Sequence, residues 1–178
     1  MGSEQAAARP TRPVHVYLSA GSNVAPVESL ARALAALADR FADLQVSGAY
    51  ANAAVGFVGA DFINLAAGFT TRLALQEVLA ELRAIEELCG RGRSDPQWAP
   101  RRMDLDVLLY DDLIGEFPGV KLPRPDLLRR AYMLGPLAEI APQVVHPTER
   151  VTIGELWARY DCAAHRLRPV ELPGAGRR

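Results

Sequence analysis

The residues of this chain best suited to chemistry are two aspartates, Asp104 and Asp106, which directly follow an arginine-rich stretch, residues 91–102. On a β-strand, residues two apart point to the same face, so the two carboxylates would lie side by side, with Cα atoms about 6.5–7 Å apart. Such a pair suits Mg²⁺, which binds through one or two carboxylates and substrate phosphates. Guanidinium groups bind phosphate oxygens in pairs. Together these residues predict transfer of a phosphoryl-type group from a nucleotide.

An Asp-x-Asp pair alone is more often part of a solvated strand face, so its surroundings decide between the two interpretations. Leu105, Val107 and Leu109 alternate with the aspartates and are expected to be buried on the opposite face. Because residues 107–110 are apolar almost throughout, we expect the strand to lie inside the sheet. Carboxylates on an interior strand must reach a cleft or find cations, since a buried unpaired charge is very costly. The surroundings therefore favour a metal site.

Strands and helices are both expected to position these groups. The expected strands are residues 14–23, 44–50, 62–71 and 103–110, and the expected helices are residues 26–40, 73–88, 129–141 and 152–160. Thr152 and Glu155 form a capping box at the start of the last helix. Residues 51–61 read as an exposed loop, and Asp111 and Asp112 as a solvated turn. Strands interspersed with helices predict an α+β sandwich with a mainly antiparallel sheet.

The composition indicates one ordinary globular domain. The chain has 178 residues and a net charge of −1, which argues against a protein that coats nucleic acid. We expect a single domain over residues 14–172, a disordered tail at 1–13 and a flexible tail at 173–178. Cys89 and Cys162 have no zinc or redox spacing, and no apolar run is long enough to span a membrane. These features predict reduced thiols, a cytoplasmic location and no membrane partner.

Several segments resemble one enzyme family. The run from Arg91 to Tyr110, in which Arg-x-Arg and Trp-x-Pro-Arg precede Asp-Leu-Asp, resembles the signature of 6-hydroxymethyl-7,8-dihydropterin pyrophosphokinase, a folate-pathway enzyme. Residues 17–23, 62–67 and 132–142 resemble its first strand, its pterin segment and its C-terminal helix segment, in the right order. The resemblance covers about residues 14–160 and implies a ferredoxin-like three-layer α-β-α sandwich.

The resemblance implies that the β,γ-pyrophosphoryl group of ATP moves to the hydroxymethyl oxygen of a reduced pterin, with release of AMP. Asp104 and Asp106 would hold two Mg²⁺ ions against the triphosphate. Positioning and electrostatics would dominate, because the substrate hydroxyl is itself the nucleophile. The catalytic residues that the resemblance implies are Arg91, Arg101, Asp104 and Asp106. The implied partners are ATP and the pterin, without nucleic acid, and we expect a monomer.

The resemblance also implies where each substrate binds. Phe62 and Tyr132 match a ring-stacking pair, and Asn64 matches an amide that reads the pterin edge. The implied pterin-binding residues are Val55, Phe62, Asn64, Trp98 and Tyr132. The implied nucleotide-binding residues are Arg91, Arg93, Trp98, Arg101, Val107, Arg124 and Arg130.

The chain departs from the family pattern at three places. Residues 51–56 lack the usual Thr-Pro dipeptide, Gln97 stands where an arginine is common, and Arg124 stands where the family usually has histidine. These departures leave the metal and stacking residues intact but allow a paralogue that acts on a related reduced pterin. Two other classes stay open. One is an Asp-x-Asp glycosyltransferase, for which the chain is short, and the other is a non-catalytic nucleotide- or RNA-binding module, which would give Asp104 and Asp106 no role.

Overall fold

The computed structural model of this chain describes residues 9–52, 61–90, 103–162 and 166–172. The elements in chain order are β1 (Val14–Ser22), α2 (Pro26–Arg40), β2 (Ala42–Val46), β3 (Ala49–Asn52), β4 (Phe62–Thr71), α3 (Leu75–Leu88), β5 (Asp104–Tyr110), β6 (Gly115–Phe117), β7 (Val120–Leu122), the 3-10 helix η1 (Pro125–Leu128), α4 (Ala131–Ile140), α5 (Ile153–Ala158) and β8 (Arg168–Val170). Within the described residues, six strands form one antiparallel sheet with the order β5-β1-β4-β3-β8, in which β2 also pairs with β4, while β6 and β7 form a separate hairpin. The predicted α+β class is confirmed.

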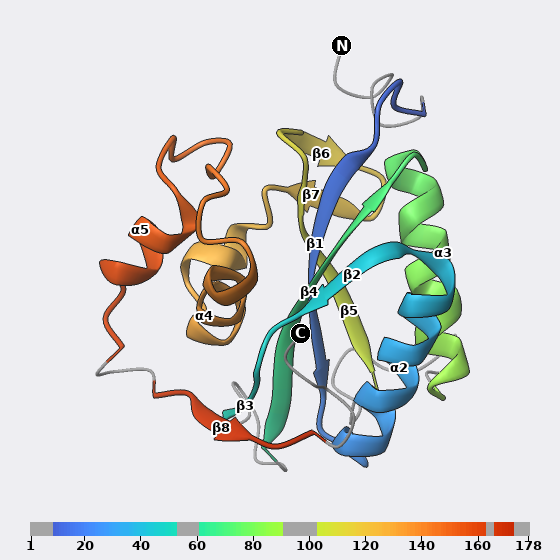
Figure 1. The fold of residues 1–178 in the computed structure, drawn as a ribbon, viewed down its shortest axis with the longest axis vertical. Coiled ribbons are helices and arrows are strands. Elements are labelled where there is room, and N and C mark those ends of the chain that lie inside the picture. Colours follow the sequence, from blue (N-terminus) through green and yellow to red (C-terminus); the bar gives the residue numbers. More distant parts are fainter. Residues whose placement is uncertain (1–8, 53–60, 91–102, 163–165, 173–178) are drawn as a thin grey trace.

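The sheet lies between two layers of helices (Figure 1). On one face, α2 and α3 bury residues such as Leu30 and Leu82 against the strands. On the other face, α4 and α5 contribute Met133 and Ile153 to a second apolar cluster. The arrangement is the three-layer sandwich that the sequence analysis predicts, and each sheet face has its own core.

The helices form where the leucine spacing and the capping residues predict them. α2 begins at Pro26, in the first turn, where the missing N–H of proline costs nothing. α5 is shorter than expected, but its start is the predicted one. The Thr152 hydroxyl accepts the Glu155 N–H at 3.2 Å, and the Glu155 carboxylate accepts the Thr152 N–H at 2.9 Å. Reciprocal capping of this kind satisfies two donors that the helix leaves unpaired.

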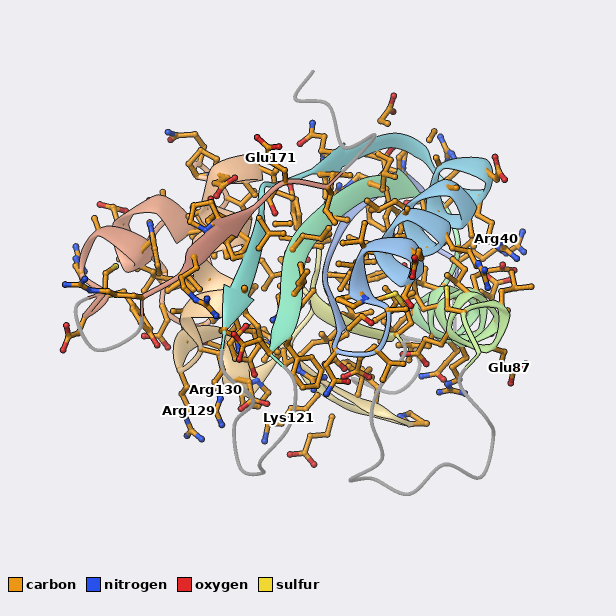
Figure 2. The ribbon with its side chains drawn as sticks, turned by 90° about the horizontal axis from the view of Figure 1, so that it is seen from below. Arg40, Glu87, Lys121, Arg129, Arg130 and Glu171 are labelled. Atoms are coloured by element: carbon orange, nitrogen blue, oxygen red, sulfur yellow. The ribbon has the colours of Figure 1, made fainter. Side chains whose placement is uncertain are left out.

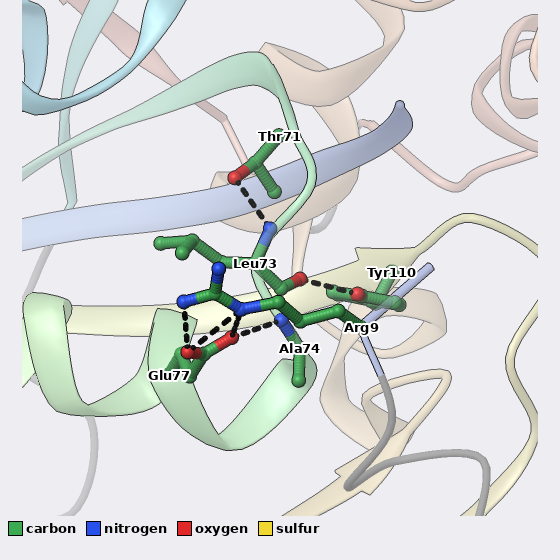
Figure 3. A network of polar contacts seen from close by, with 6 residues as sticks. All are labelled: Arg9, Thr71, Leu73, Ala74, Glu77 and Tyr110. Atoms are coloured by element: carbon green, nitrogen blue, oxygen red, sulfur yellow. Dashed lines mark hydrogen bonds and ion pairs between the residues drawn. The ribbon is translucent and has the colours of Figure 1, made fainter. Parts of the chain in front are cut away.

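A network of polar contacts holds the start of α3 (Figure 3). The Glu77 carboxylate accepts the Ala74 N–H at 2.8 Å and an Arg9 guanidinium N–H at 2.6 Å. The Tyr110 hydroxyl donates to the Leu73 carbonyl at 2.7 Å and so connects α3 to the end of β5. Arg9 belongs to the stretch 1–13, of which the structure describes residues 9–13. The domain boundary at residue 14 stays a prediction.

β5, which carries Asp104 and Asp106, lies at the edge of the sheet. Among the strands described it pairs only with β1, so the prediction of an interior strand is wrong. The strand is nevertheless apolar because helices cover both of its faces. Its outer edge is partly covered as well, since the Arg124 N–H donates to the Leu108 carbonyl at 3.0 Å. β5 is therefore apolar because its two faces are buried, although it has only one strand neighbour among the described strands. For this reason its apolar run resembles that of an interior strand.

The prediction that Leu109 shares a face with Leu105 and Val107 is also wrong. The register of β5 against β1 shifts at Tyr17 and Leu18, which marks a β-bulge. Leu105 and Val107 therefore pack under α2 and α3, whereas Leu109 packs under α4. All three side chains are buried, as predicted.

The second expected strand, residues 44–50, is two strands in the structure. β2 and β3 both pair with β4, and the break falls at Ser47, whose hydroxyl accepts the Ala66 N–H at 2.9 Å. Ala51 and Asn52 belong to β3 rather than to the expected loop. The hairpin β6–β7 and strand β8 have no counterpart among the expected elements, because three residues carry too little periodicity to indicate a strand.

The remaining predictions concern a turn, the thiols and the membrane. Asp111 and Asp112 form the predicted turn, but Asp111 is not merely solvated, because Arg12 pairs with its carboxylate at 2.6 Å. Cys89 is buried and Cys162 is exposed, and both are free thiols, as predicted. No helix within the described ranges has the length and apolar character that crossing a membrane requires.

Candidate active site

Three of the predicted site residues lie on one face of the sheet, the face that α4 covers. Gly21 of β1 pairs with Asp104 of β5 on one side and with Asn64 of β4 on the other. Asp106 lies two residues further along β5, opposite Ser19. Because the side chains of paired residues point to the same face, the two carboxylates and the amide line one surface.

The Asn64 side chain is buried and held in place by its neighbours. It is only 5% exposed, and its amide N–H donates to the side-chain oxygen of Asn52. Its carbonyl oxygen lies against Gly21, where an added Cβ would collide with it. Sequence reasoning missed Asn52 because that residue falls in the segment assigned to a loop. The result is an amide in a fixed orientation, suited to reading the edge of a polar ring.

Asp104 and Asp106 are both half-buried, and their strand is held from the opposite side. The Leu105 N–H, between the two aspartates, donates at 2.8 Å to the carboxylate of Glu86, a buried residue of α3. An Arg124 guanidinium nitrogen lies 3.0 Å from a carboxylate oxygen of Asp106. The two carboxylates therefore sit on a backbone with little freedom, within reach of a cation.

The carboxylate pair fits a divalent metal ion that takes only some of its ligands from the protein. Within the described ranges no group of three or more His, Cys, Asp or Glu side chains is arranged to hold a metal ion. Mg²⁺ does not need such a group, because it usually keeps waters and takes further ligands from substrate phosphates. Two half-buried carboxylates on one strand face match that requirement, so Asp104 and Asp106 are fitting ligands for Mg²⁺.

The predicted stacking residues come from two different elements. Phe62 is the first residue of β4, and Tyr132 lies in the first turn of α4; both are half-buried. Burial raises the pKa of the Tyr132 phenol, and the charges that act on it include Arg130, Asp126 and Asp106. The phenol is therefore neutral near pH 7 and belongs to the electrostatic surroundings of the carboxylate pair.

The two described arginines of the predicted nucleotide site, Arg124 and Arg130, precede η1 and α4 respectively. Arg130 is the N-cap residue of α4, and its carbonyl accepts the Leu134 N–H at 3.0 Å. Figure 2 shows Arg129, Arg130 and Lys121 together at the lower edge of that view. Arg124 lies closer to the carboxylates, through its contact with Asp106. Arg124 thus places positive charge beside the half-buried acidic pair, as binding of a polyphosphate would require.

Val107 lies on the opposite side of β5 from the aspartates. Its side chain is 1% exposed and packs under α2 and α3. Any contact of Val107 with a nucleotide would therefore use its backbone. The other predicted site residues, Val55, Arg91, Arg93, Trp98 and Arg101, lie outside the described residues, and their roles stay predictions.

Comparison with known proteins shows the family to which this chain belongs. The family model for 7,8-dihydro-6-hydroxymethylpterin-pyrophosphokinase matches residues 17–142. The chain is 34% identical over 142 residues to the 2-amino-4-hydroxy-6-hydroxymethyldihydropteridine pyrophosphokinase of Aquifex aeolicus, which covers 79% of this chain and 88% of the relative. It is 38% identical over 148 residues to the enzyme of the same name from Synechocystis sp., with 81% and 75% covered.

Solved structures share the fold at lower sequence identity. Wild-type HPPK-DHPS from Plasmodium falciparum, crystallised with STZ-DHP, superposes with a TM-score of 0.66 at 14% identity. The match covers 88% of this chain and 45% of that chain, so this chain spans less than half of the solved protein. The family model and the curated relatives both extend over most of the sequence, and this chain belongs to the 7,8-dihydro-6-hydroxymethylpterin-pyrophosphokinase family.

Proposed function

We propose that this chain transfers the pyrophosphoryl group of ATP to the hydroxymethyl oxygen of 6-hydroxymethyl-7,8-dihydropterin, giving AMP and the pterin diphosphate in folate biosynthesis. Membership of the pyrophosphokinase family supports this activity. The structural observation that carries it is the row Asp104–Gly21–Asn64 across three neighbouring strands. This row brings a carboxylate suited to metal and an amide suited to a pterin onto the same surface.

Asp104 and Asp106 are the residues that would hold Mg²⁺. When bound, the metal would neutralise and orient the triphosphate. The half-buried carboxylates keep their orientation because Glu86 of α3 fixes the backbone between them. The chain itself thus supplies two carboxylates on a strand that cannot easily move away from α3.

The pterin is a flat heteroaromatic ring with polar edges, and three described residues suit it. Phe62 and Tyr132 offer aromatic faces, and the fixed amide of Asn64 offers donors and an acceptor in the plane of a ring. Because Tyr132 stays protonated near pH 7, its ring would pack against the pterin without adding a charge. Val55 and Trp98 are proposed to complete this site.

The arginines are proposed to act on the phosphates. Arg91 and Arg101 would stabilise the charge that develops on the migrating and leaving groups, while Arg93, Arg124 and Arg130 would hold the nucleotide. No side chain needs to form a covalent intermediate, because the pterin hydroxyl attacks phosphorus directly. Orientation and charge stabilisation would therefore account for most of the rate.

The test is a product assay. Purified protein is incubated with ATP, Mg²⁺ and 6-hydroxymethyl-7,8-dihydropterin, and AMP and the pterin diphosphate are quantified by chromatography. We expect both products in equal amounts, and none without the pterin. Formation of ADP instead, or failure to form AMP with properly folded protein, would overturn the proposal. Repeating the assay with related reduced pterins would show whether the departures at residues 51–56, at Gln97 and at Arg124 have changed the substrate.

A further inference from the structure

Arg124 occupies a position between two carboxylates at the edge of the site. One guanidinium nitrogen, Nη1, lies 3.0 Å from Oδ1 of Asp106, and Nε lies 4.0 Å from Oδ2 of Asp126. The side chains of Arg124 and Asp106 are 27% and 24% exposed, so water screens this ion pair only in part. The backbone of Arg124 is fixed as well, because its N–H donates to the Leu108 carbonyl of β5.

The contact with Asp106 engages one of the two carboxylate oxygens that could bind a metal. Mg²⁺ approaches carboxylate oxygens to about 2.0–2.1 Å and demands a near-octahedral shell of oxygen ligands. A guanidinium nitrogen at 3.0 Å from Oδ1 occupies one lone-pair direction of that oxygen, and its positive charge repels a metal ion bound to the same carboxylate. Arg124 and a metal ion therefore compete for the Asp106 carboxylate.

We infer that the Arg124 guanidinium pairs with Asp106 in place of a metal ion when no substrate is bound, as a stand-in cation. When the metal binds with ATP, it displaces the guanidinium from Asp106, and the guanidinium then pairs with a phosphate of the nucleotide. The inference rests on the proposed function, because it takes Asp106 to be a metal ligand. It deepens that function by assigning Arg124 two successive partners: the carboxylate before the substrate binds, and the phosphate afterwards.

The incomplete hydrogen bonding of the Arg124 side chain supports a second position for its guanidinium group. Nε is buried and finds no hydrogen-bond partner within the part of the chain that the structure describes. A buried donor without a partner is unfavourable, so the position seen here does not satisfy the side chain fully. Phosphate oxygens would accept from Nε and Nη together, since a guanidinium matches them in pairs. Asp126, on the neighbouring η1, would keep the released guanidinium close to the site.

This arrangement makes a prediction that a simple phosphate-binding arginine does not. Removing Arg124 should strengthen the binding of metal alone, because the competing cation is gone, yet weaken the binding of ATP. We expect Arg124→Ala to bind Mn²⁺ up to about fivefold more tightly in the absence of nucleotide, as loss of a partly exposed ion pair suggests. We expect the same variant to bind ATP in the presence of Mn²⁺ about tenfold more weakly or worse, because a charged hydrogen bond to phosphate is lost.

The experiment measures free Mn²⁺ by electron paramagnetic resonance in titrations of nucleotide-free protein, and ATP affinity by calorimetry with Mn²⁺ present. Arg129→Ala is the matched control, because it removes an exposed positive charge from the same segment, five residues along, and should change metal affinity little. Arg124→Lys, which keeps the charge without the planar group, should give an intermediate metal affinity. Circular dichroism checks that each variant is folded.

Two results would overturn the inference. One is an unchanged or weaker Mn²⁺ affinity in Arg124→Ala, and the other is an equal gain in Arg129→Ala, which would reflect net charge alone. Asp106→Asn separates this failure from failure of the proposed function. If Asp106→Asn loses Mn²⁺ while Arg124→Ala gains nothing, the metal site stands and only the stand-in role is wrong. If Asp106→Asn binds Mn²⁺ as the wild type does, the metal site itself is wrong.

Discussion

Gly21 of β1 lies directly beneath the side chain of Asn64 on β4. The two residues are paired across the sheet, and a Cβ atom on Gly21 would collide with the amide oxygen of Asn64. The absence of a side chain at Gly21 is therefore what allows the Asn64 amide to lie over the backbone of β1. A glycine without positive φ thus has a steric role in the site.

We predict that Gly21→Ala impairs pterin binding more than ATP binding. The new methyl group must push the Asn64 amide aside, so the KM for the pterin should rise about tenfold or more while the KM for ATP changes little, as loss of a hydrogen-bonded contact suggests. Steady-state kinetics with each substrate varied would measure both constants. Asn52→Ala, which removes the hydrogen-bond partner of Asn64, should act in the same direction but less strongly. Equal losses for both substrates would contradict the steric explanation.

We predict that Asp106→Asn reduces turnover by at least about a hundredfold, the range expected when a preorganised charge contact is lost. The amide keeps the size of the side chain but lacks the negative charge that a hard cation requires. Rates at saturating ATP and pterin, over a range of Mg²⁺ concentrations, would test this. Asp112→Asn, an exposed turn residue, is the control for loss of one negative charge and should leave the rate unchanged. Activity of Asp106→Asn close to that of the wild type at ordinary Mg²⁺ would remove Asp106 from the metal site.

We predict that Glu86→Ala destabilises the protein by about 1–3 kcal/mol, the cost of leaving a buried N–H unpaired. The donor is the Leu105 N–H, which lies between the two aspartates and donates to Glu86 at 2.8 Å. Urea denaturation would measure the free energy of unfolding. Glu86→Gln keeps an acceptor oxygen and should lose less stability than Glu86→Ala. Equal stability of the two variants would show that the hydrogen bond to β5 contributes little.

We predict that His146 makes the protein less stable in acid. Its side chain is 2% exposed, and burial lowers the pKa of the imidazole below its usual value. The folded state therefore binds a proton less readily than the unfolded state. The stability that the neutral ring contributes is present above about pH 6.5, the unfolded value, and is lost as the pH falls toward the folded pKa.

Thermal melting between pH 7.5 and pH 5 would measure this effect of His146. His146→Asn keeps an acceptor for the Glu149 N–H but does not titrate, so its melting temperature should fall less across this range. His15→Asn, at an exposed position, should behave as the wild type does. A wild-type pH dependence that His146→Asn leaves unchanged would assign the acid sensitivity to other groups.

The elements that carry long periodic patterns could be predicted from the sequence. α2 has its predicted bounds, β4 covers the predicted residues 62–71, and Thr152 caps α5 as expected. The pairing of Asp104 and Asp106 on one strand face also follows directly from their spacing. These features depend on local sequence, which is why they could be read without the fold.

Other features depend on tertiary contacts that no local pattern carries. The apolar run of β5 indicates burial but does not distinguish an interior strand from an edge strand with covered faces, and a single β-bulge moves Leu109 to the other core. Asn52 reaches the site because β3 pairs with β4. The family resemblance names Arg124 as a nucleotide-binding residue, but not its contact with Asp106. Their partners lie 12 and 18 residues away along the chain, beyond the reach of periodicity.

The edge position of β5 has a consequence for hydrogen exchange. Strands β1 and β4 are paired on both sides, so their amide hydrogens exchange with solvent only when much of the sheet opens. β5 is paired on one side among the described strands, and the contact between Arg124 and Leu108 covers its outer edge at one point. The carboxylate pair therefore sits on an edge strand that opens at a lower free energy than β1 and β4, and a ligand that bridges β5 to the segment around Arg124 would slow exchange in β5 more than in those two central strands.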